Sequence, residues 1–302
     1  MSNTIKFPYK NNKEDRIVHA TIADGQASIL IIEAKNTIAK AASIHNTSPV
    51  CTAAFGRTLI ATAMLGVRLK SDKSSVTVTV DGGGPIGKIT AVSNGKTLKG
   101  YLSVPNIIVP NRTDGKLDVA AVVGTDGLIT VVKDMGMKAP YIGQTEMVSG
   151  EIGEDFALYF MKSEQQPSIV SLGVLVSGDH VLSAGGVLVA PLPGCSDEVL
   201  DALEVRTMLM SDISHDLLDN DGETLIEKWF GGLDPIILGV SPLDYVCDCS
   251  KERMEKALIS LGKKELQEIA DDDQEGVEMI CHFCHKNHYF NNEEILQLIK
   301  KI

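Results

Sequence analysis

The sequence predicts an α+β fold in three parts, and three observations support this division. Residues 1–194 alternate short runs rich in β-branched side chains with a few helical stretches, which indicates a mixed domain of sheet and helix. Residues 195–246 carry 12 acidic side chains against two basic ones, a net charge of −10 that marks a separate, helical acidic linker. Residues 247–302 hold four of the six cysteines and are expected to form a small domain of their own.

The N-terminal domain is expected to begin with a hairpin and two helices. Asp24-Gly25, a dipeptide that favours tight turns, separates strands expected over 16–23 and 27–34. Helices are expected over 36–46 and 50–68, and the second is rich enough in Ala, Leu and Met to be buried. Further elements are strands over 75–80 and 88–92, strands on both sides of Asp126-Gly127 within 117–133, a helix over 151–164, and strands over 169–176 and 181–192.

A glycine-rich segment follows the strand expected over 75–80. Gly82, Gly84 and Gly87 match the G-x-G-x-x-G pattern of dinucleotide-binding proteins. Phosphate binding by that pattern requires a helix to begin there, so that its N-terminal N–H groups face the anion. Another strand, over 88–92, follows instead. The segment is therefore expected to be a wide glycine turn between strands.

No catalytic group is expected in this domain. His19, His45 and His180 stand alone in the sequence, and isolated histidines are more often core or surface residues than catalysts. Cys51 and Cys195 are expected to be inert, because no cationic neighbour would stabilise their thiolates. Without a nucleophile–base pair or a credible phosphate loop, the protein is not expected to be an enzyme.

Composition excludes several kinds of partner. The net charge of −12 argues against nucleic acid, whose binding depends on Lys and Arg. No stretch approaches the roughly 20 apolar residues of a membrane span, and the first residues lack the apolar core of a secretion signal. A cytoplasmic location is expected. There thiols stay reduced, and paired cysteines favour metal binding or catalysis over structural disulfides.

The linker over 195–246 is expected to be helical and amphipathic. Ser196 is a candidate N-cap, and apolar residues recur loosely at helical spacing over some twenty residues. Residues 219–222 interrupt this pattern, and a second short helix over 224–230 carries Trp229, the only tryptophan. Two interpretations remain open. The linker is either a solvated connector, or a metastable element that docks on the N-terminal domain while its like charges favour release.

Four cysteines define the C-terminal domain. Cys247 and Cys249 form a C-x-C pair, and Cys281 and Cys284 form a C-x-x-C pair 31 residues further on. Four thiolates can complete a tetrahedral shell around Zn²⁺, with sulfur at about 2.3 Å from the ion. A unit of 56 residues has too small a core to be stable alone. Zinc is therefore expected to hold this domain together.

The C-x-x-C pair is expected to form a knuckle between two strands, which places both sulfurs on one side. Histidines 282, 285 and 288 lie nearby, but four cysteines already fill the shell, so these histidines are expected to tune the thiols or face solvent. The expected elements are helices over 251–261 and 263–273, strands over 277–280 and 288–290, and a final helix that begins at Asn291 or Asn292 and ends at Lys300-Lys301.

Other chemistries compete for the same cysteines. Residues 281–285 match the C-x-x-C-H motif of c-type haem attachment, but that interpretation leaves the C-x-C pair unexplained and lacks an export signal. A thioredoxin-like pair would begin a helix after a strand, whereas this one is expected in a hairpin. A purely structural zinc site does not need a C-x-C pair. The two sulfurs of the C-x-C pair are close enough to form a strained, labile disulfide ring on oxidation. Zinc also keeps the thiols in the thiolate form, which reacts with peroxide.

With these motifs the chain resembles the redox-regulated thirty-three-kilodalton heat-shock chaperone family over nearly its whole length. No ligand position departs from the family pattern. The matching segments are Cys247-x-Cys249, Cys281-x-x-Cys284, GRTLIATAMLG (56–66), DGGGPIGKI (81–89), PYIGQTEMVSGEIGEDFALYFMKSEQQPS (140–168) and AGGVLVAPLPG (184–194).

The resemblance implies an ATP-independent holdase that is inactive while Cys247, Cys249, Cys281 and Cys284 bind one Zn²⁺ per chain. Oxidation would eject zinc and form the disulfides Cys247–Cys249 and Cys281–Cys284. The small domain would unfold, and the acidic linker would lose its dock. Exposed apolar surface would then bind unfolding client proteins. A homodimer and transfer of clients to the seventy-kilodalton heat-shock chaperone would accompany activity.

One alternative of another class remains. The protein could be a constitutive, zinc-stabilised binding or adaptor protein in which the cysteines are purely structural. Substitution of Cys281 and Cys284 by serine separates the two, because only the switch predicts altered redox control of activity.

Overall fold

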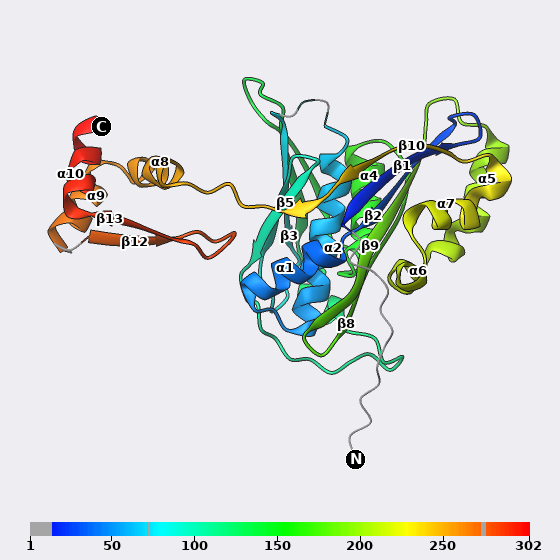
Figure 1. Ribbon diagram of the computed structural model, residues 1–302, viewed down its shortest axis with the longest axis horizontal. Coiled ribbons are helices and arrows are strands. Elements are labelled where there is room, and N and C mark those ends of the chain that lie inside the picture. The colour runs from blue at the N-terminus through cyan, green and yellow to red at the C-terminus, as the bar shows by residue number, and fades with distance from the viewer. Residues whose placement is uncertain (1–13, 70, 72, 273–275) are drawn as a thin grey trace, which may run out of the picture.

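Two β-sheets enclose one long apolar helix in the body of the protein (Figure 1). The computed structural model describes residues 14–302 except 70, 72 and 273–275. The five-stranded sheet has the order β10-β1-β2-β9-β8 and is antiparallel throughout. Its strands are β10 (Ile236–Pro242), β1 (Arg16–Ile22), β2 (Ala27–Glu33), β9 (His180–Pro191) and β8 (Ile169–Ser177).

The six-stranded sheet has the order β11-β5-β4-β3-β6-β7. All its neighbouring strands are antiparallel except β11 and β5, which are parallel. Its strands are β11 (Asp244–Tyr245), β5 (Thr97–Leu102), β4 (Ile89–Ser93), β3 (Ser75–Asp81), β6 (Leu128–Asp134) and β7 (Tyr141–Glu146).

Helix α2 (Pro49–Gly66) is the centre of the largest core. Proline at its first position suits a helix start, and its many small residues (Ala, Thr and Gly) let it lie close to both sheets. The sequence expectation that no stretch approaches a membrane span does not hold for this helix, which is long and apolar enough to cross a membrane by length and composition, although 89% of it is buried inside the protein. It is a core helix here. Helices α1 (Lys35–His45) and α4 (Gly153–Ser163) pack beside it.

The glycine-rich segment is a turn between β3 and β4, as predicted. A Cβ atom on Gly82 or Gly84 would lie 2.4 Å from a backbone carbonyl oxygen, so only glycine fits this close approach. The approaching carbonyls belong to residues 122–124 at the end of α3 (Val119–Val123). The sequence predicted a strand there. That prediction is wrong, because the Asp118 side chain accepts the Ala121 N–H and caps a short helix.

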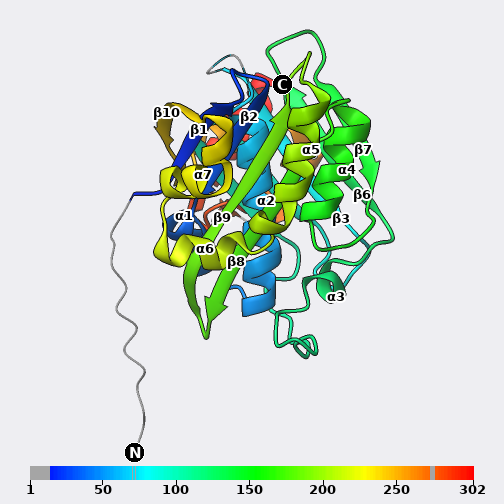
Figure 2. The same cartoon turned by 90° about the vertical axis from the view of Figure 1, so that its right-hand side faces the viewer.

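The acidic linker docks on the outer face of the five-stranded sheet (Figure 2). Its helices are α5 (Asp197–Arg206), α6 (Ile213–Asp219) and α7 (Gly222–Phe230), with 3₁₀ turns over Thr207–Met210 and Gly231–Leu233. Leu203, Ile213, Leu225 and Trp229 are buried against that sheet face, which supports the docking interpretation over the solvated connector. Residues 236–245, the last part of the linker that as a whole was expected to be helical, form β10 and β11 within the two sheets.

The C-terminal unit projects from one end of the body (Figure 1). It consists of α8 (Lys251–Leu261), α9 (Lys263–Asp272), the hairpin β12 (Gly276–Ile280) and β13 (Asn287–Asn291), and α10 (Asn292–Lys301). Among its described residues, seven buried apolar side chains form its core. Asn291 caps α10 in a reciprocal capping box with Glu294. These elements agree with the sequence prediction.

Candidate metal centre

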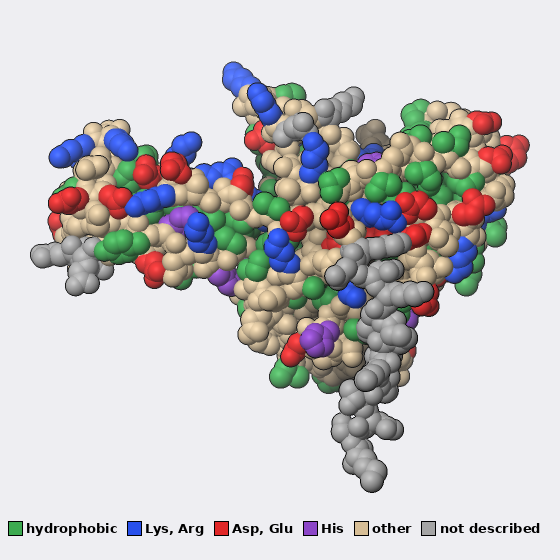
Figure 3. All heavy atoms as spheres, in the orientation of Figure 1, with side chains coloured by type: hydrophobic (Ala, Val, Ile, Leu, Met, Phe, Trp, Pro, Cys, Tyr) green, Lys and Arg blue, Asp and Glu red, His purple; other side chains and the backbone are tan. Residues whose placement is uncertain are grey.

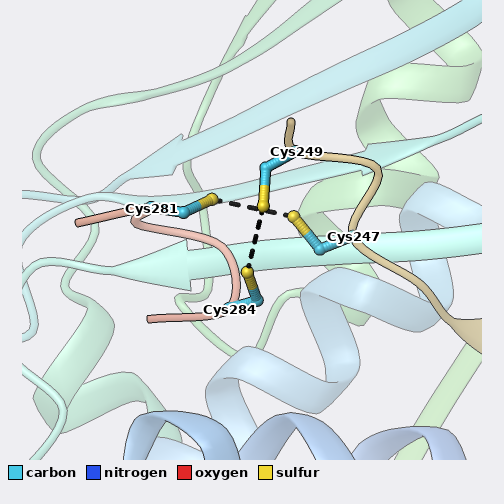
Figure 4. A group of neighbouring side chains, drawn as sticks. All are labelled: Cys247, Cys249, Cys281 and Cys284. Carbon is cyan, nitrogen blue, oxygen red and sulfur yellow. Dashed lines mark hydrogen bonds between the residues drawn. The ribbon is translucent and has the colours of Figure 1, made fainter. Parts of the chain in front are cut away.

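The four predicted ligands converge on one point (Figure 4). The sulfur atoms of Cys247, Cys249, Cys281 and Cys284 all lie within 4.8 Å of one another. The distance from Cys247 Sγ to Cys281 Sγ is 3.7 Å, and that from Cys249 Sγ to Cys284 Sγ is 3.5 Å. In the described part of the chain, this is the group of His, Cys, Asp or Glu residues that could hold a metal ion.

The sulfur spacing fits a tetrahedral ion. Four ligands at about 2.3 Å from a common centre lie about 3.8 Å from one another. The two measured contacts are close to that edge length and far above the S–S bond length of about 2.05 Å. All six cysteines fall within the described residues, and all are free thiols. The site therefore has the geometry of a four-thiolate metal shell.

Local backbone structure presents the two cysteine pairs. Cys247 and Cys249 lie between β11 and α8, in extended chain that ends where the Ser250 side chain caps α8. Cys281 and Cys284 lie in the turn between β12 and β13. There the Cys281 N–H donates to the Lys286 carbonyl at 3.0 Å, and the His285 N–H donates to the Cys281 carbonyl at 2.8 Å. These bonds close the turn as the predicted knuckle.

Burial and close mutual contact disfavour the ionisation of several of these thiols at the same time. Burial, followed by the neighbouring thiols, raises the pKa of Cys249 to about 11. Burial also raises the pKa of Cys247. The pKa of Cys284 is lowered despite its burial, chiefly because the Lys286 N–H and the neighbouring thiols donate hydrogen bonds to its sulfur. A bound dication would stabilise all four as thiolates, which is the form that ligates zinc.

The three knuckle histidines take different positions. His288 is buried, with Nε2 at 3.4 Å from Cys249 Sγ, where it can tune that thiol. The ring of His282 lies 5.5 Å from that of Tyr101 in β5. The ring of His285 lies 4.8 Å from that of His45 in α1. The last two therefore contact the N-terminal body.

His45 is a buried core residue, in agreement with the sequence expectation, but it has partners that the sequence did not indicate. Its Nε2 lies 3.2 Å from the Tyr245 hydroxyl, which also contacts the backbone carbonyl of Phe283 in the knuckle at 2.7 Å. These partners lie far apart in sequence, and no periodicity or motif could have joined them. His45 and Tyr245 are the neighbours of the site that sequence reasoning missed.

The remaining singled-out residues stay outside the cluster. His19 Nε2 lies 3.2 Å from Ser241 Oγ, and His180 is exposed at the start of β9. Burial raises the pKa of the Cys51 thiol. Burial and the Asp197 carboxylate raise that of Cys195. Both raised values agree with the expectation of inert thiols.

Comparison with known proteins covers nearly the whole chain. The family model described as Hsp33 protein matches residues 15–291. A "33 kDa chaperonin" of Alkaliphilus oremlandii is 43% identical over 96% of this chain and 97% of its own length. One of Bacillus pumilus is 42% identical over 95% and 99%. A crystal structure of a 33 kDa chaperonin (heat shock protein 33 homolog) from Thermotoga maritima matches with a TM-score of 0.87 at 32% identity, over 96% of this chain and 99% of that one.

Proposed function

Because the chain belongs to the Hsp33 family of chaperones, we propose that it is a redox-regulated, ATP-independent holdase whose switch is the four-cysteine cluster. The observation that carries this proposal is the convergence of four free thiols at the spacing of a tetrahedral shell. In the resting state Cys247, Cys249, Cys281 and Cys284 hold one Zn²⁺. Bound zinc would keep all four sulfurs as thiolates and hold the small domain folded.

Oxidation would end this zinc-bound resting state. Each proposed disulfide, Cys247–Cys249 and Cys281–Cys284, forms when two thiolates transfer two electrons to one peroxide, which takes up two protons and leaves as two waters. The closest sulfur contacts of the reduced form join the two pairs to each other, at 3.7 and 3.5 Å. Disulfides within each pair would end that convergence and leave the ion without its shell.

Loss of the shell would release the rest of the switch in steps. We infer three units, residues 1–194, 195–246 and 247–302. The seven-residue core of the third is too small to persist without its metal. The acidic linker covers apolar side chains of the five-stranded sheet, including Val18, Ile29 and Val187. Undocking would expose this surface to unfolded client proteins, and it would leave a linker whose like charges oppose re-docking.

Other parts of the proposal follow the family resemblance. We propose a cytoplasmic protein, where reduced thiols permit the zinc-bound resting state. Active chains would form homodimers and pass clients to the seventy-kilodalton heat-shock chaperone. The family is one of chaperones, and no enzymatic activity is proposed for this chain.

The test measures three quantities on one sample. Reduced, zinc-loaded protein is treated with peroxide at mild heat, and released zinc, free thiols and suppression of client aggregation are followed together. We expect one zinc and four thiols to be lost per chain as suppression appears, and thiol reductant to reverse all three. Peptide mapping identifies the disulfide pairs.

A Cys281→Ser, Cys284→Ser variant separates this proposal from the adaptor alternative. The switch predicts suppression of aggregation without peroxide, whereas an adaptor would lose only stability. Retention of zinc and absence of any gain in activity in oxidised wild-type protein would contradict the proposed function.

A further inference from the structure

The tip of the β12–β13 hairpin reaches the end of the body that carries β5 and α1 (Figure 1). Four side chains of the body meet it there, namely His45, Lys99, Tyr101 and Tyr245, which together are called the docking patch. Opposite them lie residues 281–285 of the knuckle. The contacts between the two sides are of three kinds: aromatic, ionic and hydrogen-bonded.

The aromatic and ionic contacts centre on Phe283, the middle of the knuckle. Its ring lies 5.2 Å from that of Tyr101, nearly perpendicular at 78°, which is a favourable edge-to-face arrangement. The Lys99 ammonium lies 5.1 Å from the centre of the same ring. Lys99 also forms an ion pair with Asp248, the residue between the two cysteines of the C-x-C pair. The patch thus contacts both ligand pairs.

The hydrogen-bonded contact is the Tyr245 hydroxyl, which is almost fully buried at 1% exposure. The Gly100 N–H donates to it at 3.1 Å, and it lies 2.7 Å from both the Gly100 and the Phe283 carbonyls. A phenol has one proton to donate and two lone pairs to accept with. His45 Nε2 lies 3.2 Å from the same oxygen, and the single hydroxyl proton is shared between the Gly100 and Phe283 carbonyls, so the knuckle carbonyl is one of its two acceptors.

The contact between His285 and His45 depends on the closed shape of the knuckle. His285 has a φ of 56°, in the left-handed region that few residues other than glycine favour. This backbone turn places its ring 4.8 Å from that of His45 at an angle of 81°. The same turn is closed by the bonds of Cys281 to Lys286 and His285. The histidine ring and the cysteine sulfurs are therefore presented by a single conformation.

We propose that the docking patch is an intramolecular binding surface for the metal-loaded knuckle. The patch recognises the aromatic and carbonyl face that the knuckle presents when its two cysteines share an ion. This inference rests on the proposed function, because it names the contacts through which the metal state of the knuckle affects the N-terminal body. The patch meets the knuckle from α1, β5 and β11, and β11 is also the strand from which the chain continues to Cys247.

Hydrogen exchange on the full-length, reduced protein tests the coupling without any measurement of chaperone activity. Two amides report on the patch: Gly100 N–H, bonded to Tyr245, and Val246 N–H, which donates to the Leu98 carbonyl at 2.9 Å. Removal of zinc by a chelator is expected to speed exchange at both. Amides of β3 and β4, in the middle of the same sheet, are expected to keep their rates.

Tyr101→Ala is expected to weaken docking while it leaves all four cysteines in place. Exchange at Gly100 and Val246 in zinc-loaded protein should rise by about two- to ten-fold, the range that an aromatic pair contributes. Zinc content should stay at one per chain. Tyr141→Ala, at the opposite edge of the same sheet and 43% exposed, is the matched control and should behave as wild type.

A second variant covers the case in which Tyr101→Ala does not fold. His285→Gly removes the ring and suits the left-handed backbone, so it tests the contact without strain. Unchanged exchange at Gly100 and Val246, both in this variant and in chelated wild-type protein, would overturn the proposed docking. That result differs from failure of the proposed function, in which oxidised wild-type protein gains no chaperone activity.

Discussion

Single residues set the chemistry of the cluster, because each thiol lies in different surroundings. The knuckle backbone places a Lys286 N–H at the Cys284 sulfur and lowers its pKa, whereas burial raises the pKa of Cys247. His288 lies against Cys249. The cysteines of the cluster are therefore not equivalent in their surroundings, although their sulfurs converge on one point.

Replacement of one ligand should abolish tight metal binding. Cys284→Ser removes one of four thiolates from a shell whose formation contributes about 10–16 kcal/mol, so zinc affinity should fall at least about 100-fold. Competition with a chromogenic chelator measures this change. Cys195→Ser, a half-buried thiol outside the cluster, is the control and should retain one zinc per chain. Equal affinity in both variants would mean that the metal lies elsewhere.

His45 makes stability depend on pH. Burial, and then the nearby His285 imidazole, lower its pKa from 6.5 to about 4. The unfolded chain therefore takes up a proton at a higher pH than the folded chain, and stability falls as pH drops from 6.5 towards 4. At about 1.4 kcal/mol per pH unit, this loss is roughly 2 kcal/mol at pH 5.

His45→Gln can retain the donor to Tyr245 but does not titrate in this range. Denaturant unfolding at pH 7.5 and pH 5 should show a smaller loss of stability for the variant than for wild type. The comparison cancels the contribution of carboxylates common to both proteins. An identical pH dependence in the two proteins would refute the assignment.

At the scale of elements, the acidic linker is held by one apolar face and one ionic clamp. Arg16 of β1 donates from both terminal nitrogens to the Glu223 carboxylate at 2.8 and 2.5 Å, and from Nε to Glu33 at 3.0 Å. Glu33 also accepts the Gly222 N–H at the start of α7. The clamp opposes the mutual repulsion of the acidic residues and fixes the position of α7 on the sheet.

Leu225→Ala should weaken the docking of α7. Leu225 is fully buried between α7 and the five-stranded sheet, and such truncations cost about 2–5 kcal/mol. Trp229, 3% exposed on the same helix, is the natural probe, and its emission should shift to the red at lower denaturant than in wild type. Val205→Ala, at a side chain 78% exposed on α5, should leave the midpoint unchanged. Equal midpoints for the two variants would argue against a docked linker.

Local patterns in the sequence predicted most elements, and the failures share a cause. β-branched alternation, turn dipeptides and capping residues anticipated the β1–β2 hairpin, α2 and α10. The strand expected before Asp126-Gly127 is α3, because one cap residue outweighed strand propensity. The sequence did not predict β10 and β11, because their pairing with β1 and β5 joins segments more than a hundred residues apart.

For the candidate site too, the sequence predicted the local features and missed the contacts between distant segments. Cysteine spacing identified the four residues that converge, since C-x-C and C-x-x-C are local patterns. The contacts of the knuckle with His45, Tyr101 and Tyr245 were not predictable, because they depend on how the domains lie together. A lone histidine in a helix carries no sign of a partner some 240 residues away.

At the scale of the whole molecule, stability is unevenly distributed. Two large apolar clusters fill the body, one around α2 and one under the acidic linker. Among the described residues, neither cluster includes a residue that follows Tyr245 in the sequence. The C-terminal unit projects outward and has only a small core beside the candidate metal centre (Figure 3 shows its charged surface). Such an arrangement favours unfolding in parts over a single cooperative transition.

Chelation of the reduced protein should therefore unfold residues 247–302 and spare the body. Exchange of amides in β13 and α10 should rise by at least about 100-fold, because their protection depends on the free energy of metal binding. Amides in the middle of α2 should change by less than about twofold, because that core shares no buried side chain with the C-terminal unit. Mass spectrometry of fragments before and after chelation measures both, and re-addition of zinc is the control for reversibility. A uniform loss of protection across the chain would show instead that the protein unfolds as one cooperative unit, in which no part could act as a switch for another.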